Sequence, residues 1–216
     1  MFNCLLKKCP MRPKMFFVFF LCSIIKSSSI EEYDGEPEEL PISYYNMIKL
    51  KHIATNYLLS SVEIPYQTGS NQQIVRGIQK QTLAETFWTI FPPVEDTETS
   101  QGQPIECGST IRLYHAVTGK WLHSHKIPGH FGSGYEVTCF DGNDSGDNWI
   151  LECSNTLKVG SMFRLQHAGT GFYLATNETS EYPKQEGGEH EVFVSEEDDG
   201  NEWQTVGGIF VDDSEE

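Results

Sequence analysis

One short pattern occurs three times in this 216-residue chain and limits the folds that it can adopt. The pattern is Leu, any residue, His, any two residues, Thr, Gly or Asn, any two residues, and Leu. A tryptophan follows the first Leu of the copies by 38, 36 and 38 residues. The copies begin at Leu50, Leu113 and Leu165, and their tryptophans are Trp88, Trp149 and Trp203. Three matched units of about 50 residues indicate a fold with threefold pseudo-symmetry.

Each copy has the features of a strand, a tight corner and a return strand. Apolar residues alternate before the corner, so one face of each expected strand packs inward. These ranges are 47–51, 110–114 and 161–166. The corner needs a residue with positive φ, which Gly119 and Gly171 adopt freely and Asn56 adopts at the lowest cost among other residues. Two more strands per unit, the last at the tryptophan, give twelve. We predict an all-β chain, a β-trefoil with the repeated Leu and Trp residues in its core.

The first 30 residues differ from the rest of the chain. Basic residues precede an 11-residue apolar stretch at 15–25, and Ser27 to Ser29 follow it. This pattern is typical of a secretory signal peptide, and the apolar stretch is too short to span a bilayer. An uncleaved signal anchor is the alternative. We expect a signal peptide (1–30), an acidic linker (31–40), repeats at 41–95, 103–155 and 156–211, and an acidic tail (212–216).

The charge of the chain is strongly negative. Residues 1–30 hold five of the 15 Lys and Arg and no acidic residue, so their removal takes the net charge from −16 to −21. A nucleic-acid partner needs clustered Lys and Arg and is therefore excluded. The acidic runs at the two ends are expected to be solvated. Low-affinity calcium binding is an alternative, although neither run has the ligand spacing of an EF-hand.

Three of the six cysteines lie in the expected signal peptide, which leaves Cys107, Cys139 and Cys153. An oxidising compartment then permits one bridge and one free thiol. Cys107 stands just before the second repeat and Cys153 just after its tryptophan. Because these two bracket one unit, we predict the disulfide Cys107–Cys153.

Candidate binding residues lie where the repeats differ. The corner histidines would be spread around a symmetric barrel, so we interpret them as structural. Only unit two has Leu122-His123-Ser124-His125 on its return strand, with His123 and His125 on one face. We predict a recognition patch of Trp121, His123, Ser124 and His125. Two alternatives remain: a zinc site that adds His130 or a carboxylate, and a purely structural role.

The prediction assigns no catalytic residue, cofactor or metal. No Gly-x-Ser-x-Gly motif surrounds Ser124, and nothing in the sequence places two carboxylates together. Asn143 and Asn177 each begin an Asn-x-Ser/Thr sequence and are candidate N-glycosylation sites.

A family resemblance rests on these residues. The stretch from Gly108 to Leu113, with His115, Thr118-Gly119, the Leu-His-Ser-His segment, Glu136-Val137 and Asn148-Trp149, resembles the MIR repeat. MIR repeats occur in protein O-mannosyltransferases, in inositol trisphosphate and ryanodine receptors, and in stromal cell-derived factor 2. A signal peptide followed by three such units is similar to the stromal cell-derived factor 2 family. The resemblance covers about residues 41 to 211 and is weakest in unit one, where Leu59-Ser60-Ser61-Val62 replaces Leu-His-Ser-His.

The resemblance implies a non-enzymatic β-trefoil of endoplasmic-reticulum protein folding and quality control. The implied partners are a lumenal J-domain co-chaperone and the lumenal Hsp70, and the implied clients are misfolded or O-mannosylated proteins. The tail Asp213-Ser214-Glu215-Glu216 is not a His-Asp-Glu-Leu-type retrieval signal. We therefore expect retention in the lumen through a partner, or secretion.

Two other classes of function compete with this interpretation. A carbohydrate-binding trefoil, or lectin, would use aromatic platforms, for which Tyr57, Trp121 and Tyr173 stand at or near equivalent positions. However, the Gln-x-Trp pattern of ricin-type lectins is missing from the sequence. An enzyme is disfavoured, because MIR repeats of transferases accompany a multi-pass membrane region that the sequence lacks.

Overall fold

The computed structural model describes residues 40–80, 84–184, 188–196 and 200–210. The expected signal peptide, all of the acidic linker except Leu40, and the acidic tail lie outside these ranges. None of the helical turns in the described ranges has the length and apolarity that crossing a bilayer would require.

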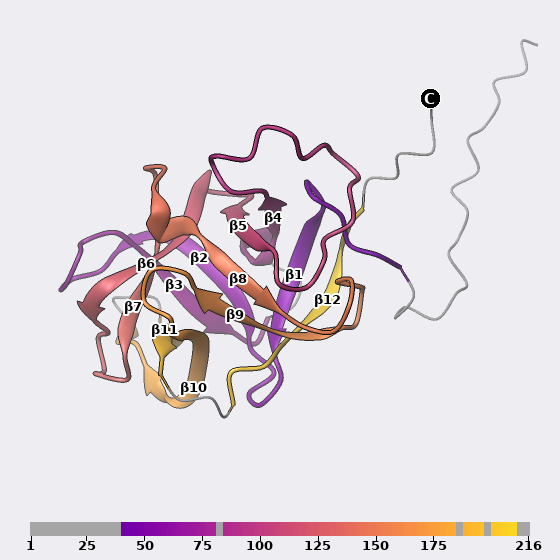
Figure 1. Cartoon of the computed structure of the whole chain (residues 1–216). Coiled ribbons are helices and arrows are strands. Elements are labelled where there is room, and N and C mark those ends of the chain that lie inside the picture. The colour runs from indigo at the N-terminus through magenta and orange to yellow at the C-terminus, as the bar shows by residue number, and fades with distance from the viewer. Residues whose placement is uncertain (1–39, 81–83, 185–187, 197–199, 211–216) are drawn as a thin grey trace, which may run out of the picture. The chain divides into compact units, whose positions relative to one another are not determined.

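The described residues form twelve strands and two short 3₁₀ turns, four strands to each unit (Figure 1). Unit one contains β1 (Met47–His52), β2 (Leu58–Pro65), β3 (Gln73–Ile78), η1 (Ala84–Thr86) and β4 (Trp88–Phe91). Unit two contains β5 (Thr110–His115), β6 (Lys120–Pro128), β7 (Tyr135–Phe140), η2 (Ser145–Asp147) and β8 (Trp149–Glu152). Unit three contains β9 (Met162–His167), β10 (Tyr173–Glu181), β11 (His190–Ser195) and β12 (Trp203–Ile209). The three strands predicted before the corners are therefore β1, β5 and β9.

Six of these strands close into a ring of antiparallel pairs. In order around the ring they are β1, β4, β5, β8, β9 and β12, and β12 pairs again with β1. The remaining strands form the hairpins β2–β3, β6–β7 and β10–β11, whose second strands β3, β7 and β11 pair with one another in a triangle. A six-stranded barrel capped by three hairpins is a β-trefoil, which confirms the predicted fold class.

Each tryptophan joins its own unit to the next. Trp88 pairs with His115 and Trp149 with His167, and Trp203 pairs with His52 of unit one. Each indole N–H also donates to the carbonyl oxygen of a return-strand leucine in its own unit. The acceptors are Leu59, Leu122 and Leu174, at 3.0, 2.9 and 2.8 Å. The repeated leucines and tryptophans are all buried in one cluster, as predicted.

The corners follow the turn chemistry expected from the sequence. Asn56, Gly119 and Gly171 have φ of 60°, 67° and 77°. The Nδ1 atom of each corner histidine lies 2.8–3.0 Å from the threonine hydroxyl three residues on. Its Nε2 atom lies 2.7–3.0 Å from a backbone carbonyl oxygen of the neighbouring unit. A carbonyl only accepts, so Nε2 carries the proton and Nδ1 accepts from the hydroxyl.

Burial keeps the corner histidines neutral. It lowers the pKa of His52, His115 and His167, the last to about 4, against the raising effect of the carbonyl acceptors. Both ring nitrogens hold the turn, so these histidines are structural elements of the barrel.

The cysteines divide as the sequence predicts. Cys107 and Cys153 form a disulfide with their Cα atoms 5.2 Å apart. Cys139 is free and buried, and burial raises the pKa of its thiol to about 12. A thiol with so high a pKa is unreactive at neutral pH.

Candidate functional site

The threefold symmetry fails at two buried positions that face each other in unit two. The strand registers Ser61–Val75, Ser124–Val137 and Thr176–Val192 align the three hairpins. In this alignment His123 of β6 corresponds to Ser60 of unit one and Ala175 of unit three. All three positions are buried, and only unit two fills its position with an imidazole.

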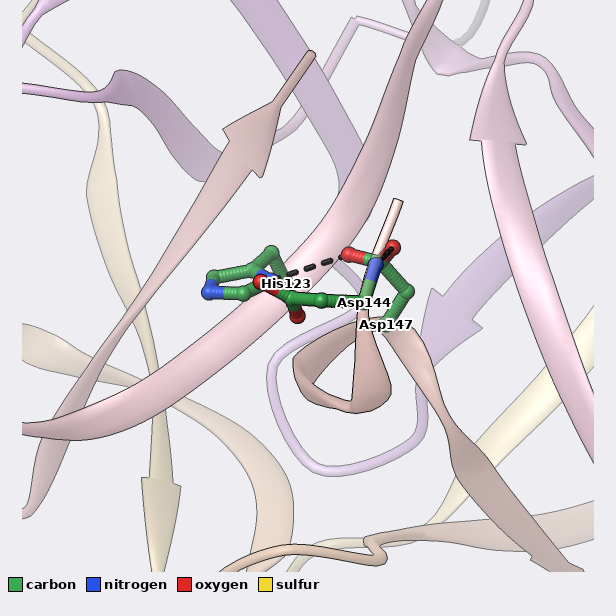
Figure 2. A group of neighbouring side chains, drawn as sticks. All are labelled: His123, Asp144 and Asp147. Carbon is green, nitrogen blue, oxygen red and sulfur yellow. Dashed lines mark hydrogen bonds and ion pairs between the residues drawn. The ribbon is translucent and has the colours of Figure 1, made fainter. Parts of the chain in front are cut away.

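The second position lies two residues before each tryptophan. Asp147 stands there in unit two, Thr86 in unit one and Asn201 in unit three, and all are at most 1% exposed. The Asp147 Oδ1 atom lies 2.9 Å from His123 Nδ1, so the two positions contact each other directly (Figure 2). Unit two therefore carries a buried acid–imidazole pair where the other units carry uncharged residues.

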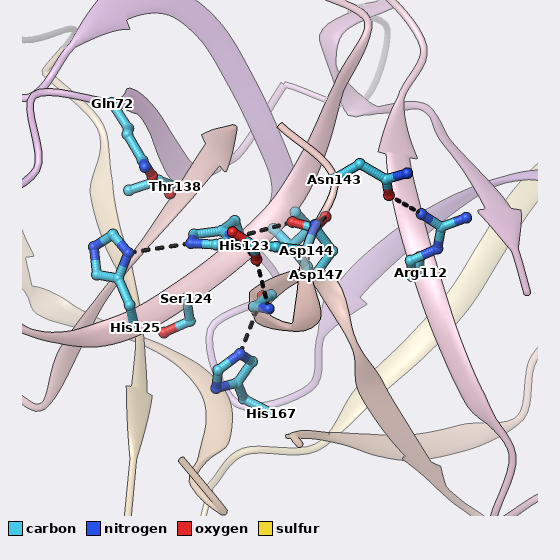
Figure 3. Close-up of polar contacts among 12 residues, drawn as sticks. Gln72, Arg112, His123, Ser124, His125, Thr138, Asn143, Asp144, Asp147 and His167 are labelled. Atoms are coloured by element: carbon cyan, nitrogen blue, oxygen red, sulfur yellow. Dashed lines mark hydrogen bonds and ion pairs between the residues drawn. The ribbon is translucent and has the colours of Figure 1, made fainter. Parts of the chain in front are cut away.

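The pair continues along β6 to His125, which Figure 3 shows in contact with His123. His123 Nε2 lies 3.1 Å from His125 Nδ1, and His125 Nε2 lies 2.9 Å from Glu136 Oε1. Glu136 is 2% exposed and also accepts from the backbone N–H of Ser70 at 3.0 Å. The result is a linear relay of carboxylate, imidazole, imidazole and carboxylate.

The loop before β8 positions the aspartates. Asp144 caps the turn η2: its Oδ1 accepts from the Gly146 N–H at 2.7 Å, while its own N–H donates to Asp147 Oδ2 at 3.0 Å. This reciprocal capping leaves Asp147 Oδ1 directed at His123. Gly146 packs closely against the imidazole, since an added Cβ would lie 2.3 Å from His123 Cε1. Its carbonyl oxygen accepts from His167 Nε2, so a corner histidine supports the same loop.

A cavity of about 430 Å³ lies beside this loop, where units two and three meet. Its walls include His123, His125, Asp144, Gly146 and Thr170. Asp144 and the ring of His125 are solvent-accessible, with 56% and 26% of their side chains exposed. The buried relay is therefore reached from solvent through a polar opening.

The structure divides the residues of the predicted recognition patch. His123 and His125 contact each other and line the cavity, as their shared strand face suggested. Ser124 is 1% exposed, and its hydroxyl donates to the Glu136 carbonyl oxygen at 2.9 Å. Trp121 belongs to another cluster, beneath the Arg112 guanidinium at 4.2 Å and beside Phe91 at 5.3 Å.

Each aromatic platform expected for a lectin has a ring face covered by another side chain. Trp121 and Tyr173 occupy equivalent positions, with Arg112 and Arg164 over their rings at 4.2 and 4.6 Å. Tyr57 lies one position earlier in its unit, is 4% exposed and stacks on His190 at 4.3 Å.

His130 and the sequon asparagines lie outside the relay. The backbone N–H of His130 donates at 2.6 Å to Glu191, which is fully buried. Burial raises the pKa of the Glu191 carboxyl to about 7, against the lowering effect of its backbone donors. Asn143 is exposed and accepts from Arg112 at 2.5 Å, while Asn177 Oδ1 accepts from the backbone of Thr179.

The sequence interpretation misses Asp144, Asp147 and Glu136 as members of the site. The loop 141–148 is Gly-, Asp- and Asn-rich, a composition that indicates only a surface loop with a glycan acceptor. A signal is available in the repeats themselves. Asp147 replaces an uncharged residue two positions before the tryptophan, just as His123 replaces a small one on the return strand.

Comparison with known proteins places the chain among named relatives. A stromal cell-derived factor 2-like protein of Arabidopsis thaliana is 37% identical over 181 residues, which cover 81% of this chain and 82% of the relative. The crystal structure of the SDF2-like protein from Arabidopsis thaliana aligns with a TM-score of 0.77 and 35% identity, over 82% of this chain and all of that one. No family model matches the chain.

A second structural likeness is to a larger enzyme. The S. cerevisiae protein O-mannosyltransferase complex, solved with its sugar donor, aligns with a TM-score of 0.70 and 25% identity. The alignment covers 83% of this chain but 27% of the transferase chain. Together with the three repeats and the trefoil, these likenesses show that the chain is a MIR-domain protein and belongs to the stromal cell-derived factor 2-like family.

Proposed function

We propose that this protein is a non-catalytic interaction module of protein folding and quality control in the endoplasmic reticulum. In this role it works in a complex with a lumenal J-domain co-chaperone and, through it, with the lumenal Hsp70. Its clients are misfolded or O-mannosylated proteins.

The single observation that carries the proposal is the state of the polar groups at the cavity. Both nitrogens of His125 and the hydroxyl of Ser124 are already engaged within the protein. Catalysis by a side chain needs a nucleophile or base directed at the substrate. Instead, the partly exposed side chains of His125 and Asp144 give the cavity a polar surface, which suits recognition.

Other features support a secretory location. The disulfide Cys107–Cys153 needs an oxidising compartment, and the first 30 residues have the pattern of a signal peptide. The aligned part of the O-mannosyltransferase is about a quarter of that chain. This protein therefore matches the MIR portion and not the remainder of the enzyme.

Affinity capture tests the proposal. The immobilised protein is expected to retain both a J-domain protein and an Hsp70 from lumenal extract, identified by mass spectrometry. The variant His125→Ala should lower their recovery by about fivefold, the effect of losing about 1 kcal/mol at an interface. Asn177→Ala, at the matching position of unit three, is the control and should retain both partners. Capture of neither protein by the wild type would refute the proposed complex.

A lectin is the second candidate, because the cavity between units two and three is polar and partly open. In addition, the aligned O-mannosyltransferase complex was solved with a bound sugar donor. The covered aromatic rings weigh against it. A glycan array that includes O-mannosyl peptides separates the two functions, since only the lectin should bind glycan in the absence of a protein partner.

A further inference from the structure

The relay through His123 joins four side chains by three polar contacts. Its three contacts, Asp147–His123, His123–His125 and His125–Glu136, measure 2.9, 3.1 and 2.9 Å. A hydrogen bond needs one proton between its two heavy atoms. Two neutral imidazoles supply one proton each and ionised carboxylates supply none. One of the three contacts therefore has two lone pairs facing each other unless a further positive charge is present.

One placement of the two imidazole protons puts this deficit at His123 Nδ1. When the imidazole protons lie on the two Nε2 atoms, His123 donates to His125 and His125 donates to Glu136. The lone pair of His123 Nδ1 then faces Asp147 Oδ1 at 2.9 Å, and Asp144 Oδ1 lies 3.7 Å from the same nitrogen. Three electron-pair donors thus converge on one point, and the donor atoms lie within 4.8 Å of one another (Figure 2).

The fold does not require this charged arrangement. The positions of His123 and Asp147 are filled by Ser60 and Thr86 in unit one. In unit three they are filled by Ala175 and Asn201, and all four residues are buried. Burying a carboxylate beside an imidazole costs free energy unless a charge compensates it, and uncharged replacements are often as stable. Two neutral solutions within the same chain indicate that the charged pair of unit two serves to hold a ligand.

We infer that His123 Nδ1, Asp147 Oδ1 and Asp144 Oδ1 form a binding site for a divalent transition-metal ion of the zinc class. An imidazole with carboxylates suits zinc, whereas calcium and magnesium prefer oxygen ligands alone. The cavity beside Asp144 gives the ion an entry path and a fourth position open to solvent. With its proton on Nε2, His123 donates to His125 Nδ1 at 3.1 Å, and such a contact orients a ligating histidine.

This site revises the prediction made from the sequence, which assigned no metal. Two of the three ligands are carboxylates from the loop before β8. His130 is not among them, and its ring lies against Phe131 and Tyr182 at 4.7 and 5.7 Å. The strongly negative chain, with a net charge of −16, attracts cations to such an opening.

Zinc titration of the full, untagged protein tests the site. After removal of metal with a chelator, calorimetry against Zn²⁺ is expected to give one equivalent bound, and Ca²⁺ should not compete. Asp147→Asn, which places in unit two the residue that unit three has at this position, should weaken zinc binding at least tenfold. His125→Gln should weaken it by about 10- to 100-fold through loss of the supporting hydrogen bond.

Asp141→Asn is the matched control. Asp141 is exposed on the same loop but outside the three ligands, so this variant removes the same charge and should bind zinc within twofold of the wild type. Thermal unfolding without metal checks that Asp147→Asn folds. If it does not, His123→Ser replaces it, because Ser60 fills the same position in unit one. Absence of stoichiometric zinc binding in the wild type, or equal losses in Asp141→Asn and Asp147→Asn, would overturn the inference.

Discussion

Position 56 illustrates at the scale of one residue how a backbone angle selects a side chain. Asn56 is exposed, so its side chain contributes little burial, yet its φ of 60° lies in the left-handed region. Gly119 and Gly171 adopt the same conformation in units two and three. Asn and Gly tolerate it best among the amino acids, and this local rule made the corner predictable from the sequence.

Substitutions at position 56 should follow this conformational cost. Asn56→Gly should leave the free energy of unfolding within about 0.5 kcal/mol of wild type, whereas Asn56→Ala should lower it by about 1 kcal/mol. Urea denaturation monitored by tryptophan fluorescence measures both values. Equal stability of the two variants would mean that the positive φ does not determine the choice of residue here.

The site residues differ in how far the sequence could reveal them. Two histidines on alternate positions of one strand share a face, so their proximity followed from the period of a strand. Asp147 reaches His123 across 24 residues through the turn η2, and Glu136 reaches His125 across a hairpin. These contacts depend on tertiary packing, which no local pattern specifies. The cover of Arg112 over Trp121 was unpredictable for the same reason.

At the scale of elements, two buried glutamates hold together the cap that the three hairpins form on the barrel. Glu136 of β7 and Glu191 of β11 stand at equivalent positions, and each accepts backbone N–H groups from the hairpin loop of the preceding unit. In unit one the same position of β3 is Ile74, which packs with Tyr66 and Tyr182 in a small buried cluster. The cap is thus asymmetric, with two polar fastenings and one apolar cluster.

Glu191 should give the cap a characteristic pH dependence. Its pKa is raised to about 7 in the folded state, so between pH 4.5 and 7 the unfolded chain loses this proton while the folded chain keeps it. This carboxyl therefore stabilises the fold fully below pH 4.5, and the contribution is lost as pH rises to about 7. The loss is on the order of 3 kcal/mol.

The variant Glu191→Gln isolates this effect, because the amide keeps an acceptor for the backbone but does not titrate. The free energy of unfolding of the variant minus that of the wild type should become more positive as the pH rises from about 4.5 to about 8. Denaturant titrations at several pH values measure this difference and cancel the titration of all other groups. A difference that stays constant with pH would show that Glu191 ionises normally in the folded protein.

At the scale of the whole molecule, the disulfide encloses unit two. Cys107 and Cys153 are separated by 46 residues, so the bridge restricts the unfolded chain over one complete repeat. Replacing both cysteines by serine should lower the free energy of unfolding by about 4 kcal/mol in the loop-entropy model. Differential scanning calorimetry of the double variant measures the loss, and reduction of the wild type should reproduce it. Unchanged stability in both experiments would contradict this account.

The order of synthesis conflicts with the order of pairing in the barrel. Each tryptophan completes the corner of the next unit, and Trp203 of the last unit completes the corner that His52 begins in the first. Strand β1 leaves the ribosome early, and its partner β12 leaves last. The barrel therefore stays open beside β1 until β12 has been made. Vectorial folding, one repeat after another, cannot finish this barrel; it closes only as a whole.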